Sequence, residues 1–265
     1  MSILGQYNIF GFYSSISART WNRQIALDVE EEPFRIFLET NHIPAVELLV
    51  SSATSATLTL LDSNDVAVGS PLSMTVESFT GGKRLIYLGT TLSSNDDGDY
   101  SLKITIDGST NYYSDVFGWT SNSDYLAELT KISAVSSNIR LGKSYFMNLT
   151  GFTFECYINA EYLGLTPDIQ EDISERFGST NILYGSFASR HEFNVWGNEY
   201  MQRFLTGLRI LESNGTVTIT HGGISFTAND IAVEKTEDVL TDVAFMMKLT
   251  FVDHSELISV YNETN

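Results

Sequence analysis

Cysteine and histidine are scarce in this chain, and their scarcity excludes several kinds of reactive centre. Cys156 is the only cysteine among 265 residues, so neither an internal disulfide nor a cysteine-based metal cluster can form. The four histidines are scattered without the spacing of a zinc site; they are His42, His191, His221 and His254. Cys156 lies in an alternating run at 152–158, which favours a small buried side chain over a reactive thiol. The sequence therefore predicts no metal site.

Positive charge is scarce as well. The chain has 15 lysines and arginines against 33 aspartates and glutamates, a formal net charge of -18. A field of that sign repels phosphate backbones and anionic lipid headgroups. The sequence has no run of 18 apolar residues, and its amino terminus lacks a cationic region followed by an apolar core. We therefore expect a protein made in the cytoplasm that neither binds nucleic acid directly nor inserts into a membrane.

Motifs of catalysis and nucleotide binding are absent from the sequence. It contains no G-x-S-x-G, no G-x-x-x-x-G-K-[ST] and no G-x-G-x-x-G after a strand. Residues 93–98 begin like a calcium loop, but Ile104 occupies the twelfth position, where a bidentate acid is needed. A carboxylate pair for glycoside hydrolysis cannot be singled out among 33 acids. The sequence favours a protein that is not an enzyme and carries no cofactor.

One short motif indicates a fold. Asp96, Gly98 and Tyr100 form a D-x-G-x-Y pattern that continues into the alternating Leu102 and Ile104. This pattern resembles the tyrosine corner of immunoglobulin-like sandwiches, in which the Tyr hydroxyl bonds to the chain a few residues upstream. Gly98 is expected to supply backbone freedom at the corner. Leu102 stands where antibody domains carry a cysteine, so the resemblance is to the broad architecture, whose members usually hold or space partners.

The strand-like runs divide the chain into three parts. With 43% hydrophobic and 12% aromatic residues, the chain can fill the cores of one or two domains. Residues 1–33 are interpreted as an N-terminal arm, residues 34–118 as an Ig-like β-sandwich and residues 119–265 as a second β-rich domain. The sandwich prediction depends on short runs separated by turn signals, at 34–38, 46–50, 56–61, 74–76, 84–88, 100–106 and 112–117. The predicted fold class is mainly β.

The second domain is expected to contain one main helix. Over 199–211, Tyr200, Phe204, Leu208 and Leu211 recur on one face, which is the spacing of an amphipathic helix that covers a sheet. The polar segment 167–177 is a candidate for a short helix. Strands are predicted at 152–158, 186–196, 217–220, 230–233 and 243–252.

The arm is rich in large apolar side chains that no periodic pattern would bury within it. They are Ile9, Phe10, Phe12, Tyr13 and Trp21. Soluble monomers avoid exposed apolar patches of this kind. We therefore expect these residues to be assembly contacts that dock on a neighbouring subunit.

A Tyr-Ser-acid-x-Phe segment at 113–117 marks the predicted junction, followed by a strand around 125–132. The later elements succeed one another at 191–195, 199–211, 214–220 and 249–253. As a pattern over about 34–255, this succession resembles virion structural proteins of tailed phages of Bacteroidota, the ring proteins of crAss-like phages among them.

That resemblance implies a non-enzymatic virion protein that forms a ring or collar in the neck or tail, between portal and tail. Its expected partners are further copies of itself in a ring homo-oligomer and neighbouring virion proteins, such as the portal and other ring or tail proteins. Its expected location is the virion, after synthesis in the host cytoplasm. The alternative is a receptor- or glycan-binding module of a tail tip or adhesin, in which Tyr112, Tyr113 or Trp196 could stack on sugars. Glycan binding lost on Tyr112→Ala or Trp196→Ala would favour that alternative.

Overall fold

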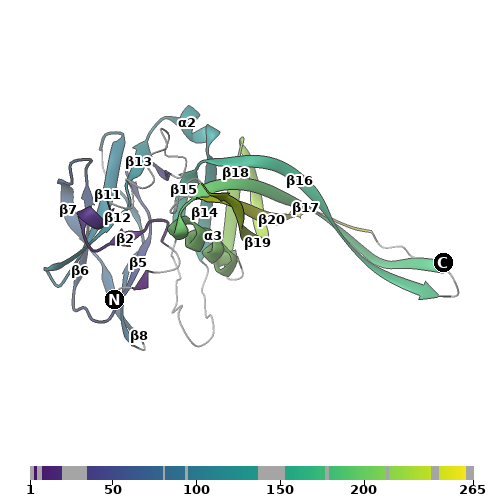
Figure 1. The fold of residues 1–265 in the computed structure, drawn as a ribbon, viewed down its shortest axis with the longest axis horizontal. Coiled ribbons are helices and arrows are strands. Elements are labelled where there is room, and N and C mark those ends of the chain that lie inside the picture. The colour runs from purple at the N-terminus through teal and green to yellow at the C-terminus, as the bar shows by residue number, and fades with distance from the viewer. Residues whose placement is uncertain are drawn as a thin grey trace.

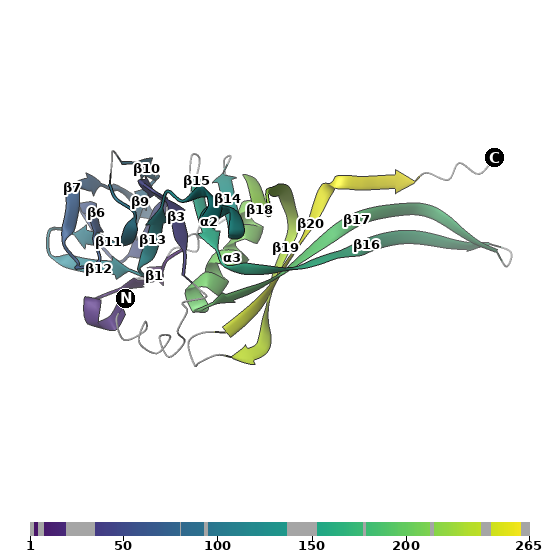
Figure 2. The same cartoon turned by 90° about the horizontal axis from the view of Figure 1, so that it is seen from above.

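The protein is mainly β, and a long β-ribbon projects from one end of its body (Figure 1). Figure 2 shows the same ribbon from above, with the carboxyl-terminal strand running beside it. The structure is a computed structural model that describes residues 3–4, 8–19, 35–79, 81–92, 95–136, 153–176, 179–212, 215–239 and 245–260. Trp21, one of the predicted assembly contacts, lies outside the described residues.

Two antiparallel sheets in the N-terminal part of the body contribute to one buried cluster. The first contains, in spatial order, β1 (Ile3–Leu4), β5 (Val46–Val50), β9 (Gly82–Tyr87) and β8 (Thr75–Phe79). The second contains β7 (Ala67–Ser73), β6 (Ala56–Leu61), β11 (Gly98–Ile106), β12 (Thr110–Ser114) and β2 (Phe12–Tyr13). Leu48 and Leu85 of the first sheet and Leu58, Leu102 and Ile104 of the second are fully buried in one cluster. The runs predicted at 46–50, 56–61 and 100–106 therefore form core strands.

β7 is a strand that the sequence analysis missed. Its side chains are mostly exposed, and it contains Gly69 and Pro71. Proline is tolerated on an edge strand, where its missing N–H faces away from the partner. Within the described part of the chain, β7 pairs with β6 alone. Because an exposed edge strand needs no apolar alternation, periodicity could not reveal it.

A long path of paired strands connects the second sheet to the C-terminal part. Starting from β11 it passes through β13 (Phe117–Thr120), β3 (Phe37–Glu39), β15 (Thr153–Ile158), β14 (Thr130–Ser136), β18 (Gly215–His221), β19 (Ile224–Val239), β20 (Phe245–Val260), β17 (Ser179–Gly197) and β16 (Ala160–Arg176). The β3–β13 pair is parallel, whereas β13 pairs with β11 in antiparallel fashion. A separate two-stranded sheet pairs β4 (His42–Ile43) with β10 (Thr90–Thr91). The boundary expected between residues 118 and 119 falls inside β13, so backbone pairing crosses it.

The helices α2 (Ser123–Glu128) and α3 (Glu199–Glu212) contact these strands. α3 contacts β14, β17, β18 and β19, and its buried side chains are Met201, Phe204, Leu205 and Leu208. The Asn198 side chain begins it by accepting hydrogen bonds from the backbone N–H groups of Tyr200 and Met201, both at 3.0 Å. This is the amphipathic helix that the sequence predicts. α2 is capped by Asn122 in the same way and replaces the strand expected from residue 125.

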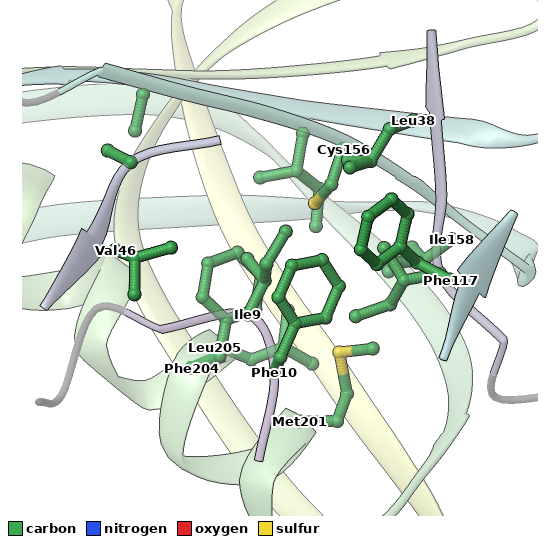
Figure 3. Packing of buried hydrophobic residues seen from close by; sticks show 14 of the residues in the cluster. Ile9, Phe10, Leu38, Val46, Phe117, Cys156, Ile158, Met201, Phe204 and Leu205 are labelled. Atoms are coloured by element: carbon green, nitrogen blue, oxygen red, sulfur yellow. The ribbon is translucent and has the colours of Figure 1, made fainter. Parts of the chain in front are cut away.

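The N-terminal segment belongs to the protein's own core, which corrects its interpretation as an assembly arm. Ile9, Phe10, Phe12 and Tyr13 are at most 7% exposed. Figure 3 shows Ile9 and Phe10 among side chains from both halves of the chain, including Phe117 and Phe204. β2 pairs with β12, and the Phe10 and Phe117 rings stack with centroids 4.9 Å apart. Because successive residues here face different surfaces, the segment has no single apolar period to recognise.

The ribbon corrects a second expectation. The segment 167–177, a candidate for a short helix, lies almost entirely in β16, which pairs with β17 from Ala160↔Val195 to Arg176↔Ser179. Pro167 fits this position because β16 is the outermost strand of its sheet. Backbone pairing with β17 therefore holds this polar segment as a strand.

Candidate functional site

The predicted tyrosine corner has a hydrogen bond at its centre. The Tyr100 hydroxyl donates to the backbone carbonyl of Asp96 at 2.8 Å, and its ring lies 4.5 Å from that of Trp119. Asp96 therefore contributes its main chain to this bond. Gly98 differs from the expectation, because its φ is outside the left-handed region and an added Cβ would meet its nearest neighbour at 3.7 Å. Its backbone conformation does not require glycine.

Asp97, in the loop that starts like a calcium site, is held by neutral donors. Its carboxylate accepts hydrogen bonds from the Thr40 hydroxyl and from the backbone N–H of Ser121, the latter at 2.7 Å. The Ser121 hydroxyl adds a third bond at 2.9 Å. These hydrogen bonds lower the pKa of the Asp97 carboxyl; the bond from Thr40 has the largest effect and the bond from the Ser121 backbone the second largest. Asp97 thus ties the turn after β3 to the segment before α2.

The side chains considered for chemistry are placed mainly in packing roles. Cys156 is fully buried and unpaired, as the sequence predicts, and burial raises the pKa of its thiol far above the usual range. Among the described residues no cluster of three or more His, Cys, Asp or Glu side chains could hold a metal ion. Tyr112 packs against the core, while Trp196 is half-buried on β17.

The ribbon leaves the body through a cluster of aromatic and histidine side chains. His191 on β17 is buried, and its Nδ1 lies 3.0 Å from the Tyr162 hydroxyl on β16. Its ring lies 4.2 Å from Phe226 and 5.2 Å from Phe251, measured between centroids. The Phe193 ring stacks on Phe251 at 5.8 Å and meets the Tyr162 ring at a tilt, with centroids 4.9 Å apart. Side chains from β16, β17, β19 and β20 thus pack together at the root of the ribbon, where it leaves the body.

A bulge follows directly after this cluster. The register of β16 against β17 shifts between Tyr162 and Gly164, and Gly164 has a φ of 115°. Bulges bend and twist the strand that carries them, and glycine tolerates the positive φ. The leucines on either side of Gly164 are exposed: Leu163 by 48% and Leu165 by 55%. The root of the ribbon therefore presents apolar surface on an edge strand.

Past the Pro167↔Ser189 pair, the hairpin of β16 and β17 projects from the body (Figure 1). Ser189 is 1% exposed and pairs with Pro167. From there to Arg176 the hairpin extends roughly 30 Å further, at about 3.3 Å per residue. β20 accompanies β17 as far as the Gly185↔Val260 pair, and the end of the hairpin is two-stranded.

The body also contains a pocket of about 580 Å³ where segments distant in sequence meet. The β3–β4 turn, α2, β14, β15 and the β18–β19 turn surround it. Leu126, Leu129 and Tyr157, which form a small cluster of their own, provide its apolar floor. Glu39 and Lys131 are the charged side chains in its lining. Sequence reasoning missed this site because its parts are separated by many residues and share no motif.

Comparison with protein-family models, with curated proteins and with solved structures finds no match for this chain. No helix in the described part of the chain has the length and hydropathy needed to cross a membrane.

Proposed function

We propose that this protein is a non-enzymatic structural component of a tailed-phage virion, forming a ring or collar in the neck or tail between portal and tail. Its partners are further copies of the chain and neighbouring virion proteins. An Ig-like N-terminal sandwich is part of the proposal. It is supported by the two antiparallel sheets that share one buried cluster and by the hydrogen bond from Tyr100 to the Asp96 carbonyl.

The projecting ribbon is the observation that carries the proposal. A two-stranded hairpin alone is at best marginally stable in water, and the end of this one pairs with no further described strand. A second surface that packs against the ribbon would stabilise it. In a closed ring every copy offers its ribbon to the next one, so a single modest contact is repeated around the symmetry.

The positions of the open strand edges favour a head-to-tail arrangement. β16, at one end of the long strand path, has an outer edge that pairs with no described strand, and the exposed Leu163 and Leu165 lie on it. At the other end of the body, β7 and β8 are edge strands. Contacts between two different surfaces generate rings when the rotation closes, and pairing would protect edges that otherwise promote aggregation.

A ribbon-deleted variant tests this account. Residues 169–187 are replaced by Asn-Gly, which suits a two-residue hairpin turn, and the chain ends at Asp253 because the remainder of β20 loses its partner. We expect the variant to keep the thermal unfolding of the full chain and to remain monomeric in sedimentation experiments in which the full chain forms rings. Rings formed equally well by the variant would contradict the role of the ribbon.

Point variants provide a matched comparison. Leu163→Ser with Leu165→Ser should weaken ring formation, whereas Val135→Ser, at a side chain 51% exposed on the inner strand β14, should leave it unchanged. The virion assignment is tested separately by mass spectrometry of purified particles of the phage that encodes the chain. Absence of the protein from intact particles would overturn that assignment whatever the ring assay shows.

A further inference from the structure

The pocket beside α2 combines an apolar floor with an unengaged carboxylate. Leu126 and Leu129 are each 8% exposed and Tyr157 is 9% exposed, so they form a fixed surface. The Glu39 side chain is exposed at the rim and has no hydrogen-bond or ion-pair partner among the described residues. Gly222 and Gly223, in the β18–β19 turn, line the opposite part of the rim without side chains. A ligand can therefore reach the floor and the carboxylate together.

The charges around the pocket favour a cation. Lys131, the positive group in the lining, forms an ion pair with Glu155 at 2.6 Å, so its charge is balanced. Asp97 holds two lining residues, Thr40 and Ser121, and adds a further negative charge next to the rim. The whole chain carries a net charge of -18. Negative groups around a concave surface raise the local concentration of cations.

We propose that this pocket binds an ammonium or guanidinium group carried on an apolar stem. The chemistry is that of a lysine or arginine side chain in a peptide segment, and also that of a free alkyl diamine. The stem would lie on Leu126 and Leu129, and the charged group would pair with Glu39. Long basic side chains bury their methylene groups while the charged end stays near water. This inference does not depend on the virion assignment.

The size of the pocket agrees with such a ligand. Ligand pockets usually have volumes of about 300 to 1,000 Å³ and few polar groups that fix orientation. The present volume, about 580 Å³, leaves room for residues that flank a basic side chain. An acidic or phosphorylated ligand would meet Glu39 as a like charge, which disfavours it.

Binding of short peptides to the full chain tests the proposal. The probes are acetyl-Gly-Lys-Gly-amide and acetyl-Gly-norleucine-Gly-amide, which share an apolar stem and differ in the ammonium group. A partly exposed ion pair contributes up to about fivefold in affinity. We expect the lysine peptide to bind about fivefold tighter than the norleucine peptide at low salt, with NMR shifts at Gly222, Gly223 and Tyr157. Equal affinities, or shifts confined to other regions, would overturn the proposal.

Two variants and one control locate the interaction. Glu39→Gln should reduce the ratio of the two affinities to about one, because the charge partner is removed. Ala127→Leu, at an exposed lining position on α2, should weaken both peptides by filling the pocket. Glu234→Gln makes the same charge change at an exposed position far along β19 and should alter neither. An unchanged ratio in Glu39→Gln would overturn the proposal.

A titration with 1,5-diaminopentane distinguishes the two sources of the ligand. Affinity equal to that of the lysine peptide, and sensitive to Glu39→Gln, would identify free diamines as ligands. Affinity weaker than that of the peptide would identify a basic side chain within a polypeptide. Either result supports the shared chemistry, whereas failure of both probes to bind would contradict it.

Discussion

The rings of Tyr100 and Trp119 lie 4.5 Å apart between centroids, and each residue also donates a hydrogen bond to a backbone carbonyl. The Tyr100 hydroxyl bonds to Asp96 at 2.8 Å, and Trp119 Nε1 bonds to His42 at 2.9 Å. The pair therefore connects the corner of β11 to β13 and β4. Because Trp119 is 2% exposed, the junction between the two halves of the chain is part of the core.

The corner hydrogen bond should contribute measurably to stability. Tyr100→Phe keeps the ring against Trp119 and removes the donor to Asp96. We expect a loss of about 1 kcal/mol in the free energy of unfolding, the usual value for such a bond. Urea denaturation of the full chain measures it. Tyr113→Phe is the control, since that hydroxyl makes no hydrogen bond within the described residues, and equal effects of the two changes would argue against the bond.

Burial of the N-terminal segment predicts a stability effect where an assembly arm would give none. Phe10 is 2% exposed and stacks on Phe117. Truncating a buried Phe removes its contacts and leaves a cavity, so Phe10→Ala should cost about 3 kcal/mol or more. Ser14→Ala, at an exposed position nearby, should have almost no effect. A Phe10→Ala protein that unfolds like the parent but fails to assemble would restore the interpretation of this segment as an arm.

The buried face of α3 makes a parallel prediction. Phe204 is 1% exposed, and Thr206 on the same helix is exposed. Phe204→Ala should lower the free energy of unfolding by about 3 to 5 kcal/mol, whereas Thr206→Ala should change it by less than about 0.5 kcal/mol. Thermal and chemical denaturation provide the measurement. Full stability of Phe204→Ala with loss of oligomers would identify this face as an interface instead of core.

His42 should make the protein less stable at mildly acidic pH. Burial lowers its pKa from 6.5, and its Nε2 is buried without a hydrogen-bond partner among the described residues. In the unfolded chain the ring binds a proton near its ordinary pKa, so the stability present above pH 6.5 falls as the pH decreases toward the lower folded-state value. His42→Gln should therefore reduce the loss of stability between about pH 7.5 and pH 5.5. An identical loss of stability in parent and variant would show that protonation of His42 is not its cause.

Local periodicity predicted the elements that bury one face. The apolar residues of α3 recur at helical spacing, and those of β11 alternate, so both elements could be predicted before their partners were known. The buried state of Cys156 followed from the same alternation. In these elements the burial pattern is encoded within a short run of the chain.

Tertiary structure alone decided the features that carry the proposals. Ile9 and Phe10 are buried between surfaces contributed by distant segments, which no local period records. The ribbon is held by cross-strand hydrogen bonds and by the cluster around His191, and both depend on residues distant in sequence. The polar segment 167–177, taken by itself, therefore gave no signal of a strand and was interpreted as a candidate short helix. The pocket with Glu39 exists because turns separated by many residues meet beside α2. Sequence determines burial where one element faces one core; contacts between remote segments depend on the path of the folded chain.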